Sequence, residues 1–285
     1  MPELPEVETI RRQLAPEVAG RVVRRLDVLD PLWSRPVDPA ELGAAVSGRG
    51  IREMGRRGKY LLLRLDGGET LAMHLRMTGN LLLVEDGEAA EARFLRARFE
   101  LDDGRELWFT DARRFGQALL LGDERLEEHL AERLGLEPFS EDFTPAALGE
   151  MAAGRSAPLK SFLLDQKGVA GVGNIYADEA LFRASLHPLS PAGSMRSGHL
   201  EDLHEGILGA LRAGLDEGGA SIDDYRDARG ERGTMQDEFL VHTREGQACP
   251  RCGESIRRIV VSGRSTYFCP GCQVRLRRRR RRSRL

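Results

Sequence analysis

The chain has 285 residues, of which 41% are hydrophobic and 31% are charged. This length suggests about two domains, and the hydrophobic share excludes a disordered protein. No apolar run approaches the about 20 residues of a membrane span, and the acidic start MPELPEVE lacks the features of a signal peptide, so we expect a cytoplasmic protein without a membrane partner.

Charge is unevenly spread along the chain, although the total is close to neutral at -2. From Thr243 to the end, 13 basic residues stand against two acidic ones, so an acidic body carries a strongly basic end. Such an end can steer a protein toward polyanions, and a solvated surface is the alternative. Only three lysines, Lys59, Lys160 and Lys167, occur beside 40 arginines, which suggests positions that need a primary amine unless genomic composition explains the ratio.

The first part of the chain predicts one helix followed by strands. Apolar side chains recur at helical spacing in residues 2–14, and Pro5 suits a first turn. Apolar and polar residues then alternate in 61–65, 71–75 and 95–101. We therefore expect residues 1–134 to form an antiparallel β-sandwich domain with a leading helix.

Helical patterns dominate the middle of the chain. They cover Asp123 to about Gly135, the stretch that starts at Thr144-Pro145, about 158–167, about 174–185, and Ser197–Gly214. Residues 218–239 have no clear periodicity, and a loop of this length is usually functional or disordered. We expect a helical domain over residues 135–242, a small separate module over 243–273 and a disordered Arg-rich tail over 274–285.

All four cysteines lie in two CxxC pairs, Cys249 with Cys252 and Cys269 with Cys272. This spacing is typical of a zinc ribbon, in which four thiolates close a tetrahedral site, so we expect one structural Zn²⁺ that does no chemistry. Clustered cysteines also indicate a reducing compartment rather than a disulfide framework. The hairpin predicted between the pairs presents Arg264, which can bind phosphate or be merely solvated.

The N-terminus is a candidate nucleophile. Met1 before a small residue is normally removed, which leaves the secondary amine of Pro2 as the first atom of the chain. An α-amino group titrates near pH ~7.7 to 8.0, so part of the population is unprotonated at neutral pH and can attack a carbon centre. Glu3 and Glu6 can exchange protons with this amine, and their alternative role is that of ordinary acids at a helix start.

Two further patterns suit a nucleic acid, and each has an ordinary alternative. The glycine-rich turn 168–173 before Asn174 can present backbone N–H groups to a phosphate, although glycine turns between helices are common. Arg113 and Phe115 can occupy the gap left by an extruded base, unless Phe115 is buried in the core. Strict alternation from Leu71 assigns Met77 to the core-facing side.

The order of these motifs along the chain resembles that of the bacterial formamidopyrimidine-DNA glycosylases. The resemblance covers nearly all of residues 2–273 and lies in PELPEVETIRR, RRGKYL, HLRMTG, DARRFG, LLDQ with GVGNIYADEALF, and the terminal CxxC with GRSTYFCPGCQ. It implies an α+β multidomain fold with an N-terminal β-sandwich, a helix-two-turn-helix domain and a C-terminal zinc-ribbon hairpin. It also implies a monomeric DNA glycosylase and abasic-site lyase that removes oxidised purines from double-stranded DNA in base excision repair.

The same resemblance implies roles for individual residues. Pro2 would attack the sugar and form a Schiff base, Glu3 would protonate the sugar, Lys59 would donate the proton in β-elimination and Arg264 would serve δ-elimination. Residues 218–239 would close over the extruded base. DNA contacts are expected from Glu6, His74, Met77, Arg113, Phe115, Lys160 and Asn174, among which Met77, Arg113 and Phe115 would fill the void.

Three departures from the family pattern accompany the resemblance. Phe94-Leu95-Arg96 stands where the family usually has a histidine that contacts DNA, the body of the chain is acidic, and VRLRRRRRRSRL follows Gln273. The alternatives are the sister endonuclease for oxidised pyrimidines and a non-catalytic DNA-binding protein of the same fold. The PELPE start favours the purine enzyme, and the presence of Pro2, Glu3 and Lys59 argues against a mere binder.

Overall fold

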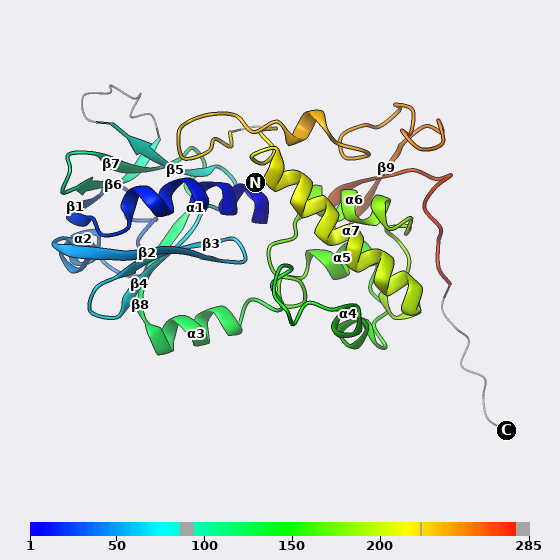
Figure 1. Cartoon of the computed structure of the whole chain (residues 1–285), viewed down its shortest axis with the longest axis horizontal. Helices are drawn as coiled ribbons and strands as arrows, with labels where there is room; N and C mark the ends of the chain where they lie inside the picture. The colour runs from blue at the N-terminus through cyan, green and yellow to red at the C-terminus, as the bar shows by residue number, and fades with distance from the viewer. Residues whose placement is uncertain (86–93, 223, 278–285) are drawn as a thin grey trace. The chain divides into compact units, whose positions relative to one another are not determined.

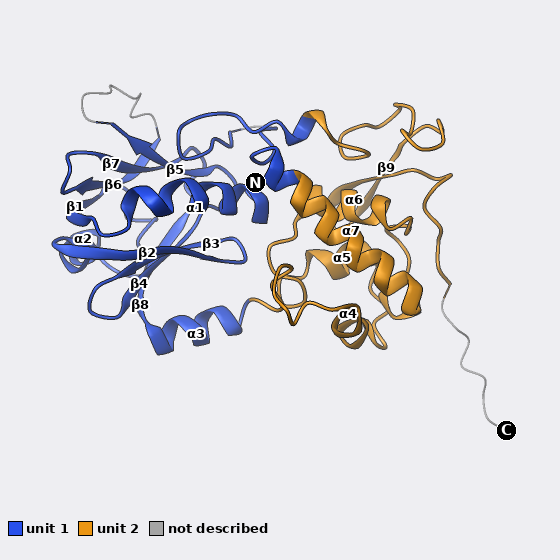
Figure 2. Ribbon diagram, in the orientation of Figure 1, with its two compact units in different colours: residues 1–133, 214–236 blue, residues 134–213, 237–285 orange. Residues whose placement is uncertain are grey.

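A computed structural model describes residues 1–85, 94–222 and 224–277. The chain divides into two units, which Figure 2 distinguishes by colour. Unit 1 comprises Met1–Arg133 and Gly214–Gln236, and unit 2 comprises Leu134–Ala213 and Asp237–Leu285. Among the described residues no helix is both long enough and apolar enough to cross a membrane.

Unit 1 is built on antiparallel strands in the order β5-β7-β6-β1-β2-β3-β4-β8 (Figure 1). Two four-stranded layers meet where β1 pairs with β2 over only two rungs, and side chains of both layers share one apolar core. The expected sandwich is therefore confirmed. The strands are β1 (Val22–Val28), β2 (Arg49–Arg57), β3 (Tyr60–Leu65), β4 (Glu69–His74), β5 (Gly79–Val84), β6 (Leu95–Leu101), β7 (Glu106–Asp111) and β8 (Gln117–Gly122).

Three helices belong to unit 1. The expected leading helix is α1 (Leu4–Val18), and its face of Val7, Ile10, Leu14 and Val18 is completely buried in the core. Helix α3 (Asp123–Ala131) matches the helix predicted from Asp123. Helix α2 (Pro39–Val46) was not predicted, because eight residues are too few to display a helical period.

Unit 2 contains the remaining predicted helices and a hairpin. Thr144 caps α4 (Pro145–Ala152), because its hydroxyl accepts the N–H of Ala147 at 3.1 Å. The other elements are α5 (Leu159–Leu164), α6 (Asn174–Arg183), η1 (Ala192–Ser194), α7 (Ser197–Asp216, which ends in unit 1), η2 (Met235–Asp237), β9 (Arg257–Val261) and β10 (Arg264–Phe268). Strand β10 packs against α6, so the hairpin forms one unit with the helices.

Residues 214–236 belong to unit 1, whereas the sequence suggested that they belong to the helical domain 135–242. Side chains of the sandwich hold this segment by its backbone. Glu6 accepts the N–H of Ala220 at 2.8 Å, and Asn80 accepts the N–H of Arg226 at 2.9 Å. Tyr225 and Ala228 add apolar contacts, since both belong to the sandwich core.

The C-terminal boundary also differs from the expectation. Disorder was expected from residue 274, but Val274 pairs with Leu186 and donates its N–H to the carbonyl of Ser185 at 2.9 Å. Leu276 donates its N–H to the hydroxyl of Ser190 at 3.0 Å. The start of the extension is thus bonded to unit 2, and residues 278–285 of the predicted tail lie outside the described residues.

We expect Gly219→Ala to destabilise unit 1 more than Gly230→Ala. Both glycines have a left-handed backbone, with φ of +88° and +81°, which costs an alanine about 1–2 kcal/mol. A Cβ at Gly219 would also lie 2.8 Å from Cγ of Glu6, whereas nothing lies within 4 Å at Gly230. Urea unfolding should therefore give Gly219→Ala an extra loss of about 2 kcal/mol. Equal losses for the two variants would show that the contact with Glu6 does not fix this segment.

Candidate functional site

Two buried carboxylates lie beside Pro2 at the start of α1. Glu3 caps the helix and is 2% exposed, and Glu6 is 1% exposed. The N–H of Glu3 donates to Oε2 of Glu6 at 2.7 Å, while Oε1 of Glu6 accepts the N–H of Ala220. Both acids are therefore held in fixed positions next to the first residues of the chain. Ordinary acids at a helix start would instead be exposed to solvent.

The turn that carries Lys59 is tied to the same helix. Arg56 donates to Oε2 of Glu8 at 3.0 Å and to the carbonyl of Gly58 at 2.8 Å, so it joins α1 to the residue before Lys59. Burial raises the pKa of Glu8, but hydrogen bonds from Arg11 and Arg56 outweigh this effect and the net pKa is lowered. Lys59 itself is 5% exposed. The structure thus bonds the turn that carries Lys59 to helix α1, which begins two residues after the candidate nucleophile Pro2.

His74 ends β4 and is held as a neutral ring. Its Nδ1 accepts the N–H of Arg76 at 3.0 Å, and Tyr60 packs edge-on against the ring with 4.7 Å between centroids. Burial, together with the charges of Arg76 and Lys59, lowers the pKa of His74 to about 3. Because Nδ1 is an acceptor, the proton of the neutral ring lies on Nε2, which can donate to a phosphate oxygen.

We expect His74 to remain neutral from pH 5 to pH 8. Between the folded pKa of about 3 and the ordinary value of 6.5, the unfolded chain binds a proton that the folded chain does not. This residue therefore lowers the stability of the fold as the pH falls from 6.5 toward 3. Ring NMR signals of His74, assigned with a His74→Gln variant, should not shift over this pH range. A titration midpoint near 6.5 would contradict the buried, neutral state.

The three residues expected to fill a DNA void lie on two turns of unit 1. Phe115 is 50% exposed, so the alternative of a buried core phenylalanine is excluded. The guanidinium of Arg113 lies 5.0 Å from the centroid of the Phe115 ring. Met77 is half-buried and does not continue the alternation of β4, because the strand ends at His74 and Arg76 takes a φ of 54°.

Arg96 lies near the position at which the family usually has a histidine. It contacts the base of the turn that carries Arg113 and Phe115. Its Nε donates to the carbonyl of Asp111 at 2.8 Å and lies 3.7 Å from the carboxylate of Asp30. Asp30 also accepts two hydrogen bonds from Arg114 at 2.7 and 2.9 Å, and these bonds outweigh its burial and lower its pKa. The guanidinium of Arg96 is thus engaged inside unit 1.

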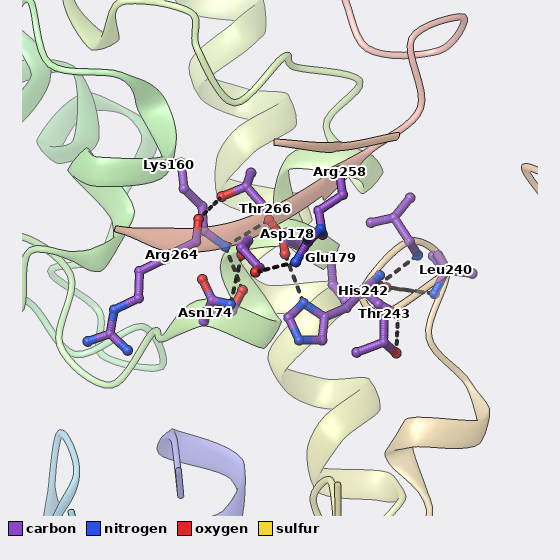
Figure 3. Close-up of polar contacts among 12 residues, drawn as sticks. Lys160, Asn174, Asp178, Glu179, Leu240, His242, Thr243, Arg258, Arg264 and Thr266 are labelled. Carbon is purple, nitrogen blue, oxygen red and sulfur yellow. Dashed lines mark hydrogen bonds and ion pairs between the residues drawn. The ribbon is translucent and has the colours of Figure 1, made fainter. Parts of the chain in front are cut away.

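In unit 2, Lys160 and Asn174 meet at the start of α6 (Figure 3). The ammonium of Lys160 donates to the carbonyl of Asn174 at 2.6 Å and to Oδ1 of Asp178 at 2.7 Å. The Lys160 side chain is completely buried, so in this arrangement it holds Asn174 and does not present its own charge at the surface. Asn174 donates its amide to the carbonyl of Ser265, while its Oδ1 is buried without a partner.

His242 is a member of this polar cluster that has no local sequence signal. Its Nδ1 lies 2.8 Å from Oδ2 of Asp178, so that carboxylate links His242 to Lys160 (Figure 3). The neighbouring Glu179 accepts the backbone N–H groups of Leu240, Val241 and His242 at 2.9 to 3.1 Å. A lone histidine next to an aperiodic stretch gave no signal of this cluster, because the acids that hold it lie more than 60 positions earlier in the chain.

Arg264 opens strand β10 and is exposed. The two-residue turn Ser262-Gly263 has positive φ at both positions, 49° and 73°, as a tight hairpin requires. Because Asn174 is bonded to Ser265, the next residue along β10, Asn174 and Arg264 belong to the same part of unit 2 (Figure 3). An exposed guanidinium and a side-chain amide in this position can bind phosphate oxygens.

The four cysteines converge as the spacing predicts. Their Sγ atoms all lie within 4.8 Å of one another, with 3.8 Å between Cys249 and Cys272 and 3.5 Å between Cys252 and Cys269. A tetrahedral zinc with Zn–S bonds of about 2.3 Å needs Sγ atoms about 3.8 Å apart, so the group fits one Zn²⁺. Burial raises the pKa of Cys249, but N–H groups of Arg251 and Cys252 outweigh it and bring the pKa to about 7. This thiol readily supplies a thiolate.

We expect the zinc to be required for the position of Arg264. Cys249 and Cys269 belong to an apolar cluster with Phe182, Val241 and Ile256, and this cluster joins the hairpin to α6. Cys269→Ser should lower the zinc content from one equivalent toward zero and unfold the hairpin, because a structural zinc site supplies folding free energy. Metal analysis and proteolysis within residues 249–272 test this. Full zinc content with an intact hairpin in Cys269→Ser would contradict it.

Three family profiles match the chain. They are the formamidopyrimidine-DNA glycosylase N-terminal domain over residues 1–118, the H2TH domain over 134–226, and a zinc finger found in FPG and IleRS over 246–274. The chain belongs to the formamidopyrimidine-DNA glycosylase family. The matched ranges include every single residue to which the resemblance assigns a role, whereas residues 227–239 of the expected closing segment and His242 lie between the second and third ranges.

Relatives in this family match over nearly the full length. The formamidopyrimidine-DNA glycosylase of Chloroflexus aurantiacus is 48% identical over 276 residues, 96% of this chain and 98% of its own. The structure of Lactococcus lactis Fpg with DNA that contains an abasic site has a TM-score of 0.88 at 34% identity, covering 95% of this chain and 99% of that chain. The Thermus thermophilus MutM (Fpg) structure has a TM-score of 0.84 at 42% identity, covering 95% and 98%.

Proposed function

We propose that the chain is a bifunctional DNA glycosylase and abasic-site lyase that removes oxidised purines in base excision repair. The observation that carries this proposal is the pair of buried carboxylates, Glu3 and Glu6, beside Pro2 in a member of this family. A protein that only binds DNA has no need for a fixed acid next to its first amine. Solved relatives were captured with DNA that contains Fapy-dG or an abasic site, which supports damaged duplex DNA as the substrate.

The first step uses the amine of Pro2, which becomes available when Met1 is removed. Its nitrogen attacks C1′ of the damaged nucleotide, and the glycosidic bond breaks. The base leaves with the electron pair of that bond and takes up a proton, while the amine loses its own proton. Glu3 donates a proton to the sugar ring oxygen, the ring opens, and an iminium forms between Pro2 and C1′. The positive nitrogen then acidifies the C2′ hydrogens, which prepares the strand for elimination.

The eliminations use the remaining polar groups. Loss of a C2′ proton breaks the bond to the 3′ oxygen, and Lys59 supplies the proton that this oxygen needs. A second elimination releases the 5′ phosphate, and Arg264 neutralises the charge of that leaving group. Asn174 and the neutral His74 donate to backbone phosphates, and Lys160 acts indirectly because it holds Asn174.

Base extrusion precedes this chemistry. A flipped nucleotide loses stacking worth a few kcal/mol, and inserted side chains offset part of that loss. The half-buried Met77 and the exposed pair Arg113 and Phe115 supply these side chains. Residues 218–239 and Glu6 close around the extruded base. The substrate also supports a location in the bacterial cytoplasm, at the nucleoid.

We expect borohydride to trap the protein covalently on a duplex with 8-oxoguanine, because it reduces the iminium to a stable amine. Pro2→Gly and a form that retains Met1 should trap at least about 100-fold less, yet bind an abasic-site analogue with an affinity within about threefold of the wild type. Glu3→Gln should lose base release while it still binds the duplex. Mass spectrometry must confirm the N-terminus of each form. Full trapping by protein that keeps Met1 would refute Pro2 as the nucleophile.

A further inference from the structure

We propose that Asp111, together with Thr78, is a positioning residue that locks the two void-filling turns into one rigid wedge. This inference rests on the proposed function, because it assigns a task to groups that do not touch the reacting atoms. Neither residue was singled out by the sequence, and both are buried, with 1% of Asp111 and 8% of Thr78 exposed.

The topology brings the two turns together. Residues 75–78 connect β4 to β5, and residues 112–116 connect β7 to β8. Strand β4 pairs with β8, and β5 pairs with β7, so the turns cross side by side from one layer of the sandwich to the other. The last rung between β5 and β7 pairs Gly79 with Asp111, directly at the base of both turns.

The carboxylate of Asp111 holds both turns at once. One oxygen accepts the hydroxyl of Thr78 and also the N–H of Arg113 at 3.1 Å. The other oxygen accepts the N–H of Gly116 at 2.6 Å. The hydroxyl of Thr78 in turn accepts the N–H of Arg113 at 3.1 Å. These bonds connect the residue after Met77 to both ends of the turn that carries Arg113 and Phe115.

Glycines allow each turn to pack tightly against its own neighbouring residues. A Cβ at Gly79 would lie 2.4 Å from the carbonyl oxygen of Leu75, and a Cβ at Gly116 would lie 2.7 Å from the Phe109 ring. The second turn is also fixed from outside, because Arg114, with a φ of 60°, makes two hydrogen bonds to the buried Asp30. Movement of one turn without the other would break both hydrogen bonds of the Thr78 hydroxyl, to Asp111 and from Arg113.

A rigid wedge matters only for the step that extrudes the base. If the side chains are fixed before DNA binds, little conformational entropy is lost when they enter the stack. Loss of the link between the turns should therefore slow the release of a stacked base. It should hardly affect cleavage at an abasic site, where no base has to leave the stack.

Thr78→Val tests the link, because it removes the hydroxyl and keeps the shape of the side chain. At saturating enzyme, single-turnover release of 8-oxoguanine should fall about tenfold, the equivalent of one lost buried hydrogen bond, while cleavage of a preformed abasic site changes less than about twofold. Thr78→Ser keeps the hydroxyl and should restore base release. The fluorescence of 2-aminopurine beside the lesion should show slower unstacking of the base in Thr78→Val but not in Thr78→Ser.

Two controls make the result decisive. Thr70→Val removes a hydroxyl of another buried threonine, at 1% exposure on β4, and should leave both reactions near the wild-type rates. Asp111→Asn should repeat the selective loss, and its combination with Thr78→Val should be no worse than Asp111→Asn alone. If Asp111→Asn does not fold, the comparison of Val with Ser at position 78 still decides.

The inference is overturned if Thr78→Val slows both reactions equally, or if it releases the base at the wild-type rate. Failure of the proposed function would look different, because the wild-type protein would then neither release the base nor cleave abasic DNA. Selective loss in Thr78→Val with rescue by Thr78→Ser supports the proposal, since general destabilisation would affect both substrates alike.

Discussion

The hydrogen bonds of the buried Glu6 carboxylate join two parts of unit 1 that lie far apart in the sequence. It accepts the N–H of Glu3, three positions earlier, and the N–H of Ala220, 214 positions later. A buried carboxylate without such donors would cost several kcal/mol, so the helix start and residues 214–236 stabilise each other. The segment expected to cover an extruded base is thereby bonded to an acid near the candidate nucleophile. The same carboxylate therefore holds both the covering segment and the start of α1.

In unit 2, buried carboxylates on α6 likewise accept hydrogen bonds from distant parts of the chain. Glu179 accepts three consecutive backbone N–H groups of residues 240–242, and its neighbour Asp178 bonds both Lys160 and His242. Two adjacent acids on one helix therefore fix a segment that leads directly into the zinc module. Buried acids that accept several hydrogen bonds give directional, rigid connections, whereas apolar packing alone tolerates sliding. Such rigidity suits a surface whose side chains must be aligned to bind phosphate groups.

The sequence predicted those features that depend on local pattern. The period of α1, the alternation of the strands, the cap at Thr144 and the spacing of the cysteines are all short-range signals, and the structure has each of them. Features that depend on long-range hydrogen bonds were missed. Nothing in the local sequence indicated that Lys160 would be fully buried, that Asp111 would join two turns, or that residues 214–236 would return to the sandwich.

Because two of the three lysines are buried, the surface is almost free of lysine side chains. Lys59 and Lys160 are 5% and 0% exposed, so Lys167 is the one exposed lysine of a chain that relies on arginine for its positive charge. An amine-directed reagent at neutral pH therefore has Lys167, on unit 2, as its exposed lysine target. A fluorophore on Lys167 would label unit 2 in the natural sequence, with and without DNA, and no cysteine of the zinc site would have to be touched.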